Sequence, residues 1–207
     1  MFRDRTDAGA RLATHLEERG VEADVVLAIP RGGLPLGRAV ADALDAPLDV
    51  VVARKMGAPT NEELAVGAVA SDGSAWLNDA LVEELGVSED YLGEERTRQA
   101  EAAREKRDRY RGAGSPPVEG RRVVLVDDGV ATGATTRACL RQLRDLGAAH
   151  VVLAVPVAPP DVLEDLSAEA DEVIALETPE PFRAVGYHYE TFGQVSDEEA
   201  IAYLDGE

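Results

Sequence analysis

One segment, residues 123–136 with the sequence VVLVDDGVATGATT, restricts the possible fold more than any other part of the chain. Its first four residues are apolar and three of them are β-branched, which favours a buried strand. The carboxylates of Asp127 and Asp128 follow directly, and small residues then lead to a helical pattern that begins near Thr132. A strand, an acidic pair, a short loop and a helix in this order predict a ligand site at the carboxyl end of a parallel strand.

The same segment also indicates the chemistry of the ligand. The start of a helix offers free backbone N–H groups and the positive end of the helix dipole, which suit a phosphate. Hydroxyls of Thr132, Thr135 and Thr136 add further donors, while Asp127 and Asp128 can accept hydrogen bonds from vicinal hydroxyls. A phosphate and a diol bound side by side correspond to a ribose 5-phosphate. The alternative, a helix that is merely capped by Thr132, does not require two adjacent acids.

The segment resembles the signature of the type I phosphoribosyltransferases, which bind 5-phosphoribosyl-1-pyrophosphate (PRPP). In that signature four hydrophobic residues precede two acids, a short spacer, Thr-Gly and a further Thr or Ser. The resemblance implies an α/β fold and binding of PRPP with Mg²⁺, the ion being held mainly through PRPP. It assigns the ribose and its Mg²⁺ to Asp127 and Asp128. It assigns the 5-phosphate to the loop of Ala131, Thr132, Gly133, Ala134, Thr135 and Thr136.

The rest of the chain alternates apolar, strand-like runs with helical patterns, which predicts a single α/β domain over residues 1–207. Its central sheet is expected to be mostly parallel and flanked by helices. The expected strands are residues 24–29, 48–53, 123–126, 151–157 and 172–176. Helices are expected near the amino terminus, over residues 34–44 and after the signature, where Gly147 ends the helix.

Two parts of the chain are expected to lie outside this regular alternation. Residues 78–120 are predicted to form a helical insertion with a linker, and residues 178–207 a small hood-like segment. Within the insertion, residues 91–111 interleave arginines with glutamates, which predicts a long helix with i,i+4 ion pairs. Its balanced charge favours a solvated face or a subunit contact over nucleic-acid binding. Residues 112–120, GAGSPPVEG, predict the linker.

Two basic segments follow predicted strands. The first holds Arg31, whose guanidinium can fork onto phosphate oxygens, before two glycines that let the backbone approach a ligand. The second ends in Lys55 and precedes residues 56–64, MGAPTNEEL, which are expected to form a mobile loop. They are similar to the family's pyrophosphate loop and flexible catalytic loop; a common turn and a solvated lysine are the alternatives. The resemblance makes Arg31 and Lys55 catalytic and assigns pyrophosphate to Arg31, Gly32, Gly33, Arg54 and Lys55.

The acceptor is less well defined. Residues 182–187, FRAVGY, are similar to a segment that stacks on the base in 6-oxopurine phosphoribosyltransferases, with one extra residue before Val-Gly-Tyr. This resemblance makes Phe182, Val185 and Tyr187 candidates for acceptor binding, and plain packing is the alternative. Those enzymes have an aspartate just before Thr-Gly, where this chain has Ala131. Ala131 cannot handle the proton of a purine, so the identity of the acceptor stays open.

Composition indicates the environment of the protein. Forty acids oppose 21 basic residues, the net charge is -19, and Lys55 and Lys106 are the two lysines. Few lysines and an acidic surface are typical of proteins from salt-rich cytoplasm, where the screening length at ~1 M salt is about 3 Å. An ordinary acidic protein of a mesophile is the alternative. Such a surface is poorly suited to nucleic acid. The lone Cys139 excludes a disulfide framework, and the histidines show no zinc-ligand spacing.

Without a signal peptide or an apolar run of membrane length, the chain is expected to be soluble, cytoplasmic and without membrane contact. The resemblance covers nearly all of the chain. It is strongest to stand-alone phosphoribosyltransferase-domain proteins of bacteria and archaea whose acceptor is unassigned, and implies a homodimer of nucleotide metabolism. The implied reaction is displacement of pyrophosphate from PRPP by a nitrogenous acceptor. The alternative is a non-catalytic regulatory protein that binds PRPP or a nucleotide; the absence of a G-x-S-x-G motif excludes an α/β hydrolase.

Overall fold

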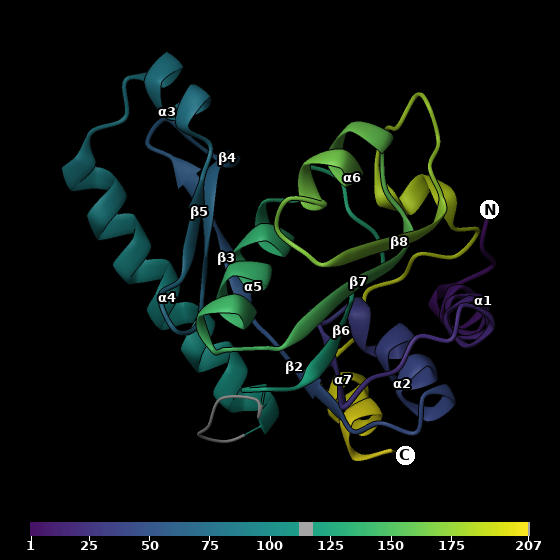
Figure 1. Ribbon diagram of the computed structural model, residues 1–207. Coiled ribbons are helices and arrows are strands. Elements are labelled where there is room, and N and C mark those ends of the chain that lie inside the picture. Colours follow the sequence, from purple (N-terminus) through teal and green to yellow (C-terminus); the bar gives the residue numbers. More distant parts are fainter. Residues whose placement is uncertain (112–117, 207) are drawn as a thin grey trace.

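A five-stranded parallel sheet forms the centre of the protein in the computed structural model, which describes residues 1–111 and 118–206 (Figure 1). The strands run in the order β2-β1-β6-β7-β8, and every pairing is parallel. Their bounds are β1 Val25–Ala28, β2 Leu48–Val50, β6 Arg122–Val126, β7 His150–Val157 and β8 Glu172–Glu177. The α/β fold with a central parallel sheet, predicted from the sequence, is therefore confirmed.

Both faces of the sheet are buried because successive side chains of a strand point to opposite sides. Leu27, Leu125 and Leu153 pack on one face against α5 and α6, whereas their neighbours Val26 and Val124 pack on the other face against α1 and α2. The bounds of these helices are α1 Arg5–Glu18, α2 Gly33–Ala43, α5 Ala134–Asp145 and α6 Pro160–Leu166. The free Cys139 is buried in the core on the α5 side.

A second sheet, antiparallel and not predicted, stands beside the first. Its strands are β3 Ala53–Ala58, β4 Asn61–Ala70 and β5 Ala75–Leu77, in that order. The expectation of a mobile loop over residues 56–64 was wrong, because these residues form the turn of the β3–β4 hairpin and parts of both strands. The polar residues that favoured a loop are exposed at the hairpin tip, while Val66 and Val69 further along β4 are buried. The strand expected over residues 48–53 is present but shorter, since β2 spans Leu48–Val50 and Ala53 begins β3.

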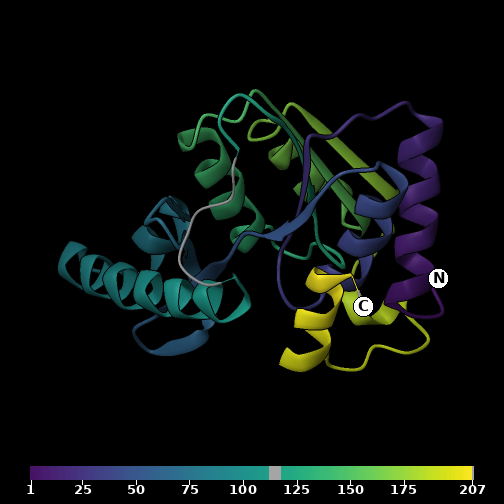
Figure 2. The ribbon, with the colours of Figure 1, turned by 90° about the horizontal axis from the view of Figure 1, so that it is seen from below.

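The insertion contains two helices, α3 Asp79–Leu85 and α4 Glu89–Arg111, so the long charged helix is confirmed. However, α4 is not a freely solvated rod, because one stripe packs against the antiparallel sheet and the body of the protein. Ala100 and Ala103 are fully buried there, together with most of Tyr110. Residues 112–117 of the predicted linker lie outside the described residues. Val118, which also belongs to the predicted linker, is buried. Figures 1 and 2 show α4 and α1 on opposite sides of the molecule.

The carboxyl-terminal segment packs against the amino terminus of the chain. It contains a 3-10 turn, η1 Val185–His188, and the helix α7 Asp197–Asp205. A single bridge pairs Phe2 with Tyr189, and their rings lie 5.5 Å apart, so the two termini close one face of the core together. Ala200 of α7 is buried near α2 and α4. No helix among the described residues is long and apolar enough to cross a membrane.

Candidate active site

The carboxyl ends of β1 and β6 define the candidate site. These strands are neighbours, Ala28 is in register with Val126, and the Ile29 amide donates to the Val126 carbonyl at 2.9 Å. The connections from β1 and β6 leave on opposite sides of the sheet, to α2 and α5. This is the position at which open α/β sheets bind ligands. The residue pattern at 30–33 and the acidic pair therefore converge although nearly a hundred residues separate them.

The glycines at 32 and 33 permit this convergence. A methyl group on Gly32 would lie 2.0 Å from Oδ2 of Asp128, and one on Gly33 would lie 2.8 Å from the Val126 carbonyl oxygen. A side chain at Gly33 would clash with the backbone at the end of β6, and one at Gly32 would displace the Asp128 carboxylate. The peptide bond between Pro30 and Arg31 is cis.

A cavity of about 540 Å³ opens between these loops, the β3–β4 hairpin and α4. Both lysines of the chain line it, although Lys55 is on β3 and Lys106 on α4. The wall formed by the parallel sheet and its loops consists of Ile29, Pro30, Gly32, Asp127, Asp128 and Thr135. The opposite wall is formed by the hairpin and the insertion, namely Ala53, Arg54, Lys55, Gly57, Glu62, Glu63, Glu95, Arg98, Gln99 and Lys106.

A smaller cavity of about 220 Å³ lies at the start of α5. Its lining includes all six residues to which the resemblance assigned the 5-phosphate, Ala131, Thr132, Gly133, Ala134, Thr135 and Thr136. Lys55, Asp127, Gly129, Val130 and Val185 complete the lining. The helix begins after Gly133, which has a φ of 74° and provides no side-chain cap, so the alternative of a Thr132 cap was wrong. The first amides of α5 are thus available to a ligand. Lys55, Asp127 and Thr135 line both cavities, which therefore adjoin.

The two acids lie between the cavities in a mostly buried position. Burial raises the pKa of Asp127 well above its usual range, and the neighbouring charge of Asp128 raises it further. Burial also raises the pKa of Asp128, against the opposing effect of Arg5, whose Nε donates to Oδ2 of Asp128 at 2.7 Å. The Asp128 amide donates to Oδ1 of Asp127 at 2.9 Å, which fixes the orientation of that carboxyl. The acids form a compact, poorly hydrated pair that favours a proton or a cation.

Arg31 turns away from the larger cavity. Its guanidinium donates to Oδ1 of Asp197 at 3.2 Å and lines a neighbouring cavity of about 370 Å³ with Arg109 and Tyr110. Asp197 also accepts hydrogen bonds from Arg109 at 3.0 Å and from Tyr110 at 2.8 Å. The backbone around Arg31 therefore borders the large cavity, whereas its side chain is held by α7.

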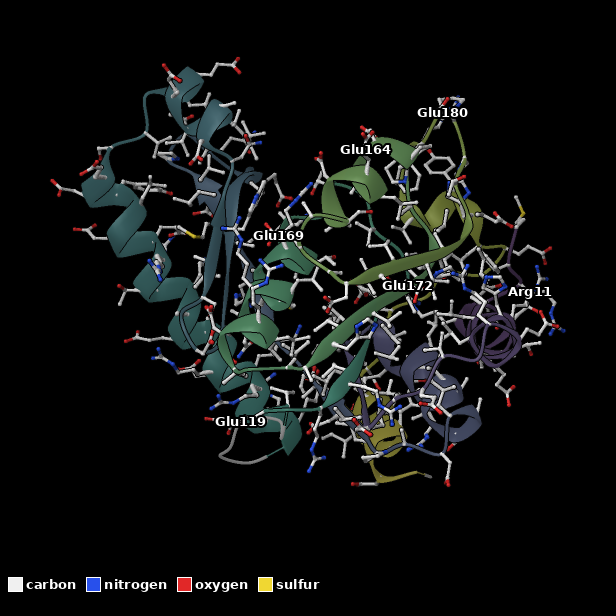
Figure 3. The ribbon with its side chains drawn as sticks, in the orientation of Figure 1. Arg11, Glu119, Glu164, Glu169, Glu172 and Glu180 are labelled. Carbon is white, nitrogen blue, oxygen red and sulfur yellow. The ribbon has the colours of Figure 1, made fainter. Side chains whose placement is uncertain are left out.

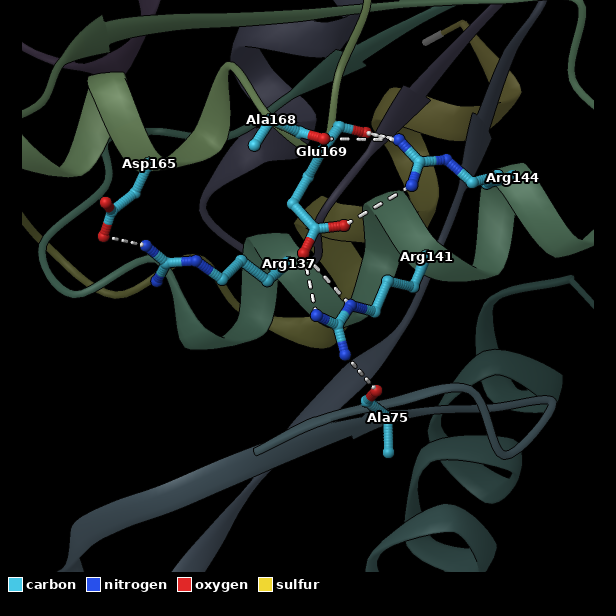
Figure 4. A network of polar contacts seen from close by, with 7 residues as sticks. All are labelled: Ala75, Arg137, Arg141, Arg144, Asp165, Ala168 and Glu169. Atoms are coloured by element: carbon cyan, nitrogen blue, oxygen red, sulfur yellow. Dashed lines mark hydrogen bonds and ion pairs between the residues drawn. The ribbon is translucent and has the colours of Figure 1, made fainter. Parts of the chain in front are cut away.

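The loop of residues 129–133 before α5 rests on Arg137, a residue of α5 that the sequence analysis did not single out. This mostly buried guanidinium donates to the Thr132 carbonyl at 2.8 Å, pairs with Asp165 of α6 at 2.7 Å, and lies 4.8 Å from the centre of the Trp76 ring. One turn along, Arg141 bonds Glu169 and the carbonyl of Ala75 in β5 (Figure 4). These contacts join the loop, α6 and the antiparallel sheet through one helix.

The carboxyl-terminal candidates divide into two groups. Val185 lies against the loop of residues 129–133, where a methyl group on Gly129 would be 2.6 Å from its Cγ1. Phe182 instead stacks on His188 with ring centres 5.3 Å apart, and Tyr187 is 65% exposed. Neither ring lines the two adjoining cavities.

Three further residues contact the site although no sequence motif marked them as site residues. Arg5 comes from α1, Lys106 comes from α4, and the hydroxyl of Tyr189 donates to the Asp128 carbonyl at 2.6 Å. Each lies far in sequence from the residue that it contacts, so only the tertiary structure brings them together. The one signal present was the scarcity of lysine, which marks Lys106 as unusual for this chain.

The structure thus combines a parallel α/β fold with an acidic pair and a small cavity at the ends of neighbouring strands. Residues 3–191 match the family described as the phosphoribosyl transferase domain, and the chain belongs to that family. A Mycobacterium tuberculosis protein, provisionally named a phosphoribosyl transferase, is 44% identical over 206 residues, which make up 99% of this chain and 46% of the relative. The chain thus spans about half the length of the curated mycobacterial relatives that it matches.

Two further comparisons agree. The crystal structure of the protein TT1426 from Thermus thermophilus is 46% identical, with a TM-score of 0.81 and coverage of 99% of this chain and 97% of that one. The bifunctional protein PyrR of Ralstonia nicotianae is 33% identical over 135 residues, which cover 59% of this chain and 76% of PyrR.

The raised pKa of Asp127 implies that its charged form lowers the free energy of unfolding at neutral pH. Because its folded pKa lies above its unfolded value, the folded state binds more protons, and stability is lost as pH rises from about 4 through the folded pKa. We predict that Asp127→Asn stabilises the protein at pH 7 by about 0.5–2 kcal/mol, the usual range for a favourable single substitution. The gain should vanish below about pH 4, where the unfolded carboxyl is also neutral.

Urea unfolding of both proteins at a series of pH values measures this difference. The exposed Asp205→Asn is the control and should change stability by less than about 0.5 kcal/mol at every pH. A destabilised Asp127→Asn protein at pH 7 would contradict the electrostatic interpretation.

Proposed function

We propose that this chain transfers a phosphoribosyl group from PRPP, with Mg²⁺, to a nitrogenous acceptor and releases pyrophosphate. The observation that carries the proposal is the pair of adjoining cavities, which share Lys55, Asp127 and Thr135. One cavity has the amino end of α5 at its base, and the other is lined by lysines. PRPP likewise has a single phosphate at one end, a diphosphate at the other, and a diol between them.

In this proposal each part of PRPP has its own group of residues. The 5-phosphate lies in the smaller cavity, where backbone amides and threonine hydroxyls donate to it. The ribose diol lies at Asp127 and Asp128, which accept its hydroxyl protons. The pyrophosphate lies in the larger cavity against the backbone of Gly32 and Gly33 and the side chains of Arg54 and Lys55.

The donor set also fits Mg²⁺. Hard carboxylate oxygens suit this ion, and the buried, like-charged pair of Asp127 and Asp128 gains from a nearby cation. Among residues 1–111 and 118–206 no group of three or more His, Cys, Asp or Glu side chains could hold a metal on its own. An ion held mainly through PRPP agrees with that finding. When bound, Mg²⁺ would neutralise charge on the phosphates.

The protein's own residues then position the donor and stabilise the leaving group. As the bond from C1 to pyrophosphate breaks, positive charge develops on the sugar ring and negative charge on the departing oxygen. Lys55 and Arg54 stabilise that negative charge. Arg31 can contribute if ligand binding exchanges its contact with Asp197 for a phosphate, and its guanidinium already lies at the edge of the site.

The acceptor is a nitrogen nucleophile that approaches C1 on the face away from pyrophosphate. Val185 is the best supported contact because it borders the loop of residues 129–133, while Phe182 and Tyr187 would have to turn toward it. Ala131 is exposed and offers no proton acceptor, which disfavours the 6-oxopurines. The same feature supports the alternative of a PRPP or nucleotide sensor without turnover. We further propose that the protein works in a salt-rich cytoplasm as a homodimer.

Binding of PRPP is the first prediction of this proposal. PRPP with Mg²⁺ at ~100 times its dissociation constant should stabilise the fold by about 2.7 kcal/mol. The double variant Asp127→Asn with Asp128→Asn should fold but bind PRPP more weakly and show a smaller stabilisation, because amides bind a diol and its metal less well. Thermal melts of both proteins in molar KCl, with and without PRPP, measure the effect. An unchanged shift in the double variant would make the acids structural.

Turnover separates the enzyme from the sensor. Lys55→Ala should lower the rate of pyrophosphate release by about 10²- to 10³-fold, with a smaller effect on PRPP affinity, because the lysine acts on charge that develops in the transition state. A release assay over purines, pyrimidines, nicotinate and small amines tests this prediction. Arg19→Ala, which removes an exposed cation paired with Glu172, is the control. Tight PRPP binding without release for any acceptor would favour the sensor.

The acidic surface predicts dependence on salt. Glutamates such as Glu164 and Glu180 project from separate parts of the molecule (Figure 3). Below roughly 0.5 M salt the Debye length exceeds about 4 Å, and repulsion within the -19 charge should unfold the protein or abolish binding. Circular dichroism and size-exclusion chromatography from 3 M to 50 mM KCl measure folding and the proposed dimer together. A spectrum unchanged at 50 mM KCl would contradict the salt adaptation.

A further inference from the structure

The insertion helix α4 contributes a cation to the larger cavity. Lys106 lines this cavity together with Lys55, so both lysines of the chain meet at one place. All other basic side chains of the protein are arginines or histidines. A lysine differs from an arginine in its compact ammonium, which carries three donors on a single nitrogen.

The buried stripe of α4 determines where Lys106 lies. Ala103 and Tyr110 are buried against β2 and α2, and Lys106 stands three residues after the first and four before the second. Positions at this spacing share one face of a helix. The packing of α4 therefore turns Lys106 toward the body of the protein instead of toward solvent.

The ammonium of Lys106 contacts the loop that approaches the candidate pyrophosphate position. Its Nζ donates to the carbonyl oxygen of Pro30 at 2.8 Å, and this is its one hydrogen bond among the residues that the structure describes. Two of its three donors remain for a ligand. The same carbonyl anchors the ammonium within the cavity that Gly32 and Asp128 line from the other side.

Charge around Lys106 favours an anion. The side chain is mostly buried, and burial together with Arg31 and Arg54 lowers the pKa of its ammonium. Asp197 and Asp127 act in the opposite direction, but no carboxylate in residues 1–111 or 118–206 forms an ion pair with it. A buried charge without a partner is costly. Acids outnumber bases about two to one in this chain, yet none of the described ones pairs with Lys106. A bound anion is therefore the best candidate for the missing partner of its ammonium.

We propose that Lys106 is a phosphate-binding residue of the pyrophosphate position, so that the insertion helix forms part of the site. This inference rests on the proposed function and adds to it a residue from outside the parallel sheet. In it, Lys106 keeps its bond to Pro30 and donates its two remaining protons to diphosphate oxygens. Charge-assisted hydrogen bonds of this kind are about twice as strong as neutral ones.

Equilibrium binding of two probes, inorganic pyrophosphate and ribose 5-phosphate, tests the proposal with Mg²⁺ present. Lys106→Gln should weaken pyrophosphate binding by about 10- to 100-fold, the range for loss of a hydrogen bond to a charged group. Ribose 5-phosphate binding should change by less than about twofold, because its phosphate lies in the smaller cavity. Arg107→Gln is the matched control, since Arg107 follows directly on α4, pairs with Asp108 and lines neither cavity.

The outcomes separate the possible failures. If the parent protein binds neither probe, the proposed function fails. If the parent binds both and Lys106→Gln binds pyrophosphate as tightly as the parent, Lys106 has no such role and the proposed function stands. Equal weakening of both probes would make Lys106 a structural support of the Pro30 loop and would also overturn the inference. Lys106→Met, which keeps the aliphatic stem, replaces the glutamine variant if the latter fails to fold, and the same criteria apply.

Discussion

The parallel pairing of β1 with β6 is the constraint on which the rest of the site depends. With Ala28 opposite Val126, the two chains leave the sheet at the same level and their loops touch. That contact is so close that Gly32 and Gly33 leave no room for a side chain. A shift of one residue in the register would separate the acids from the loop at residues 30–33 and reverse the buried face of the shifted strand. The same strand register is therefore required both for core packing and for the geometry of the site.

The cost of the site is electrostatic. Burial raises the pKa values of both Asp127 and Asp128, and burial lowers the pKa of Lys106 across the cavity. Each shift shows that the protein disfavours the charged form that the proposed reaction needs. Groups held in this way gain when a ligand of complementary charge arrives, because the ligand replaces the lost water. Acids at the proposed ribose position and cations at the proposed pyrophosphate position would match the distribution of charge in PRPP bound with a metal ion.

The sequence predicted the parallel sheet and the succession of strand, acidic pair, loop and helix at residues 123–145 because local patterns encode them. Strand, acids and Thr-Gly follow one another within residues 123–136, and the apolar runs of buried strands are equally local. The antiparallel sheet escaped prediction because the hairpin tip at residues 59–64 is polar and exposed, which in a sequence is indistinguishable from a loop. Arg5 and Lys106 escaped because their roles arise from packing between distant elements.

Ion pairs within the site reduce the free energy that PRPP can gain on binding. Asp128 is paired with Arg5, and Arg31 is paired with Asp197, so two of the side chains proposed to serve PRPP already have partners in the protein. Arg5 is held further by the Phe192 ring, 3.9 Å from its guanidinium carbon, and by the Gly193 carbonyl. A ligand gains only the difference between its own contacts and those that it displaces. Arg54, Lys55 and Lys106 form no ion pair with a described carboxylate. They can therefore bind an anion without breaking an existing ion pair. The diphosphate end of PRPP should consequently provide the larger share of the binding energy, and the acids a smaller share through the diol and its metal ion.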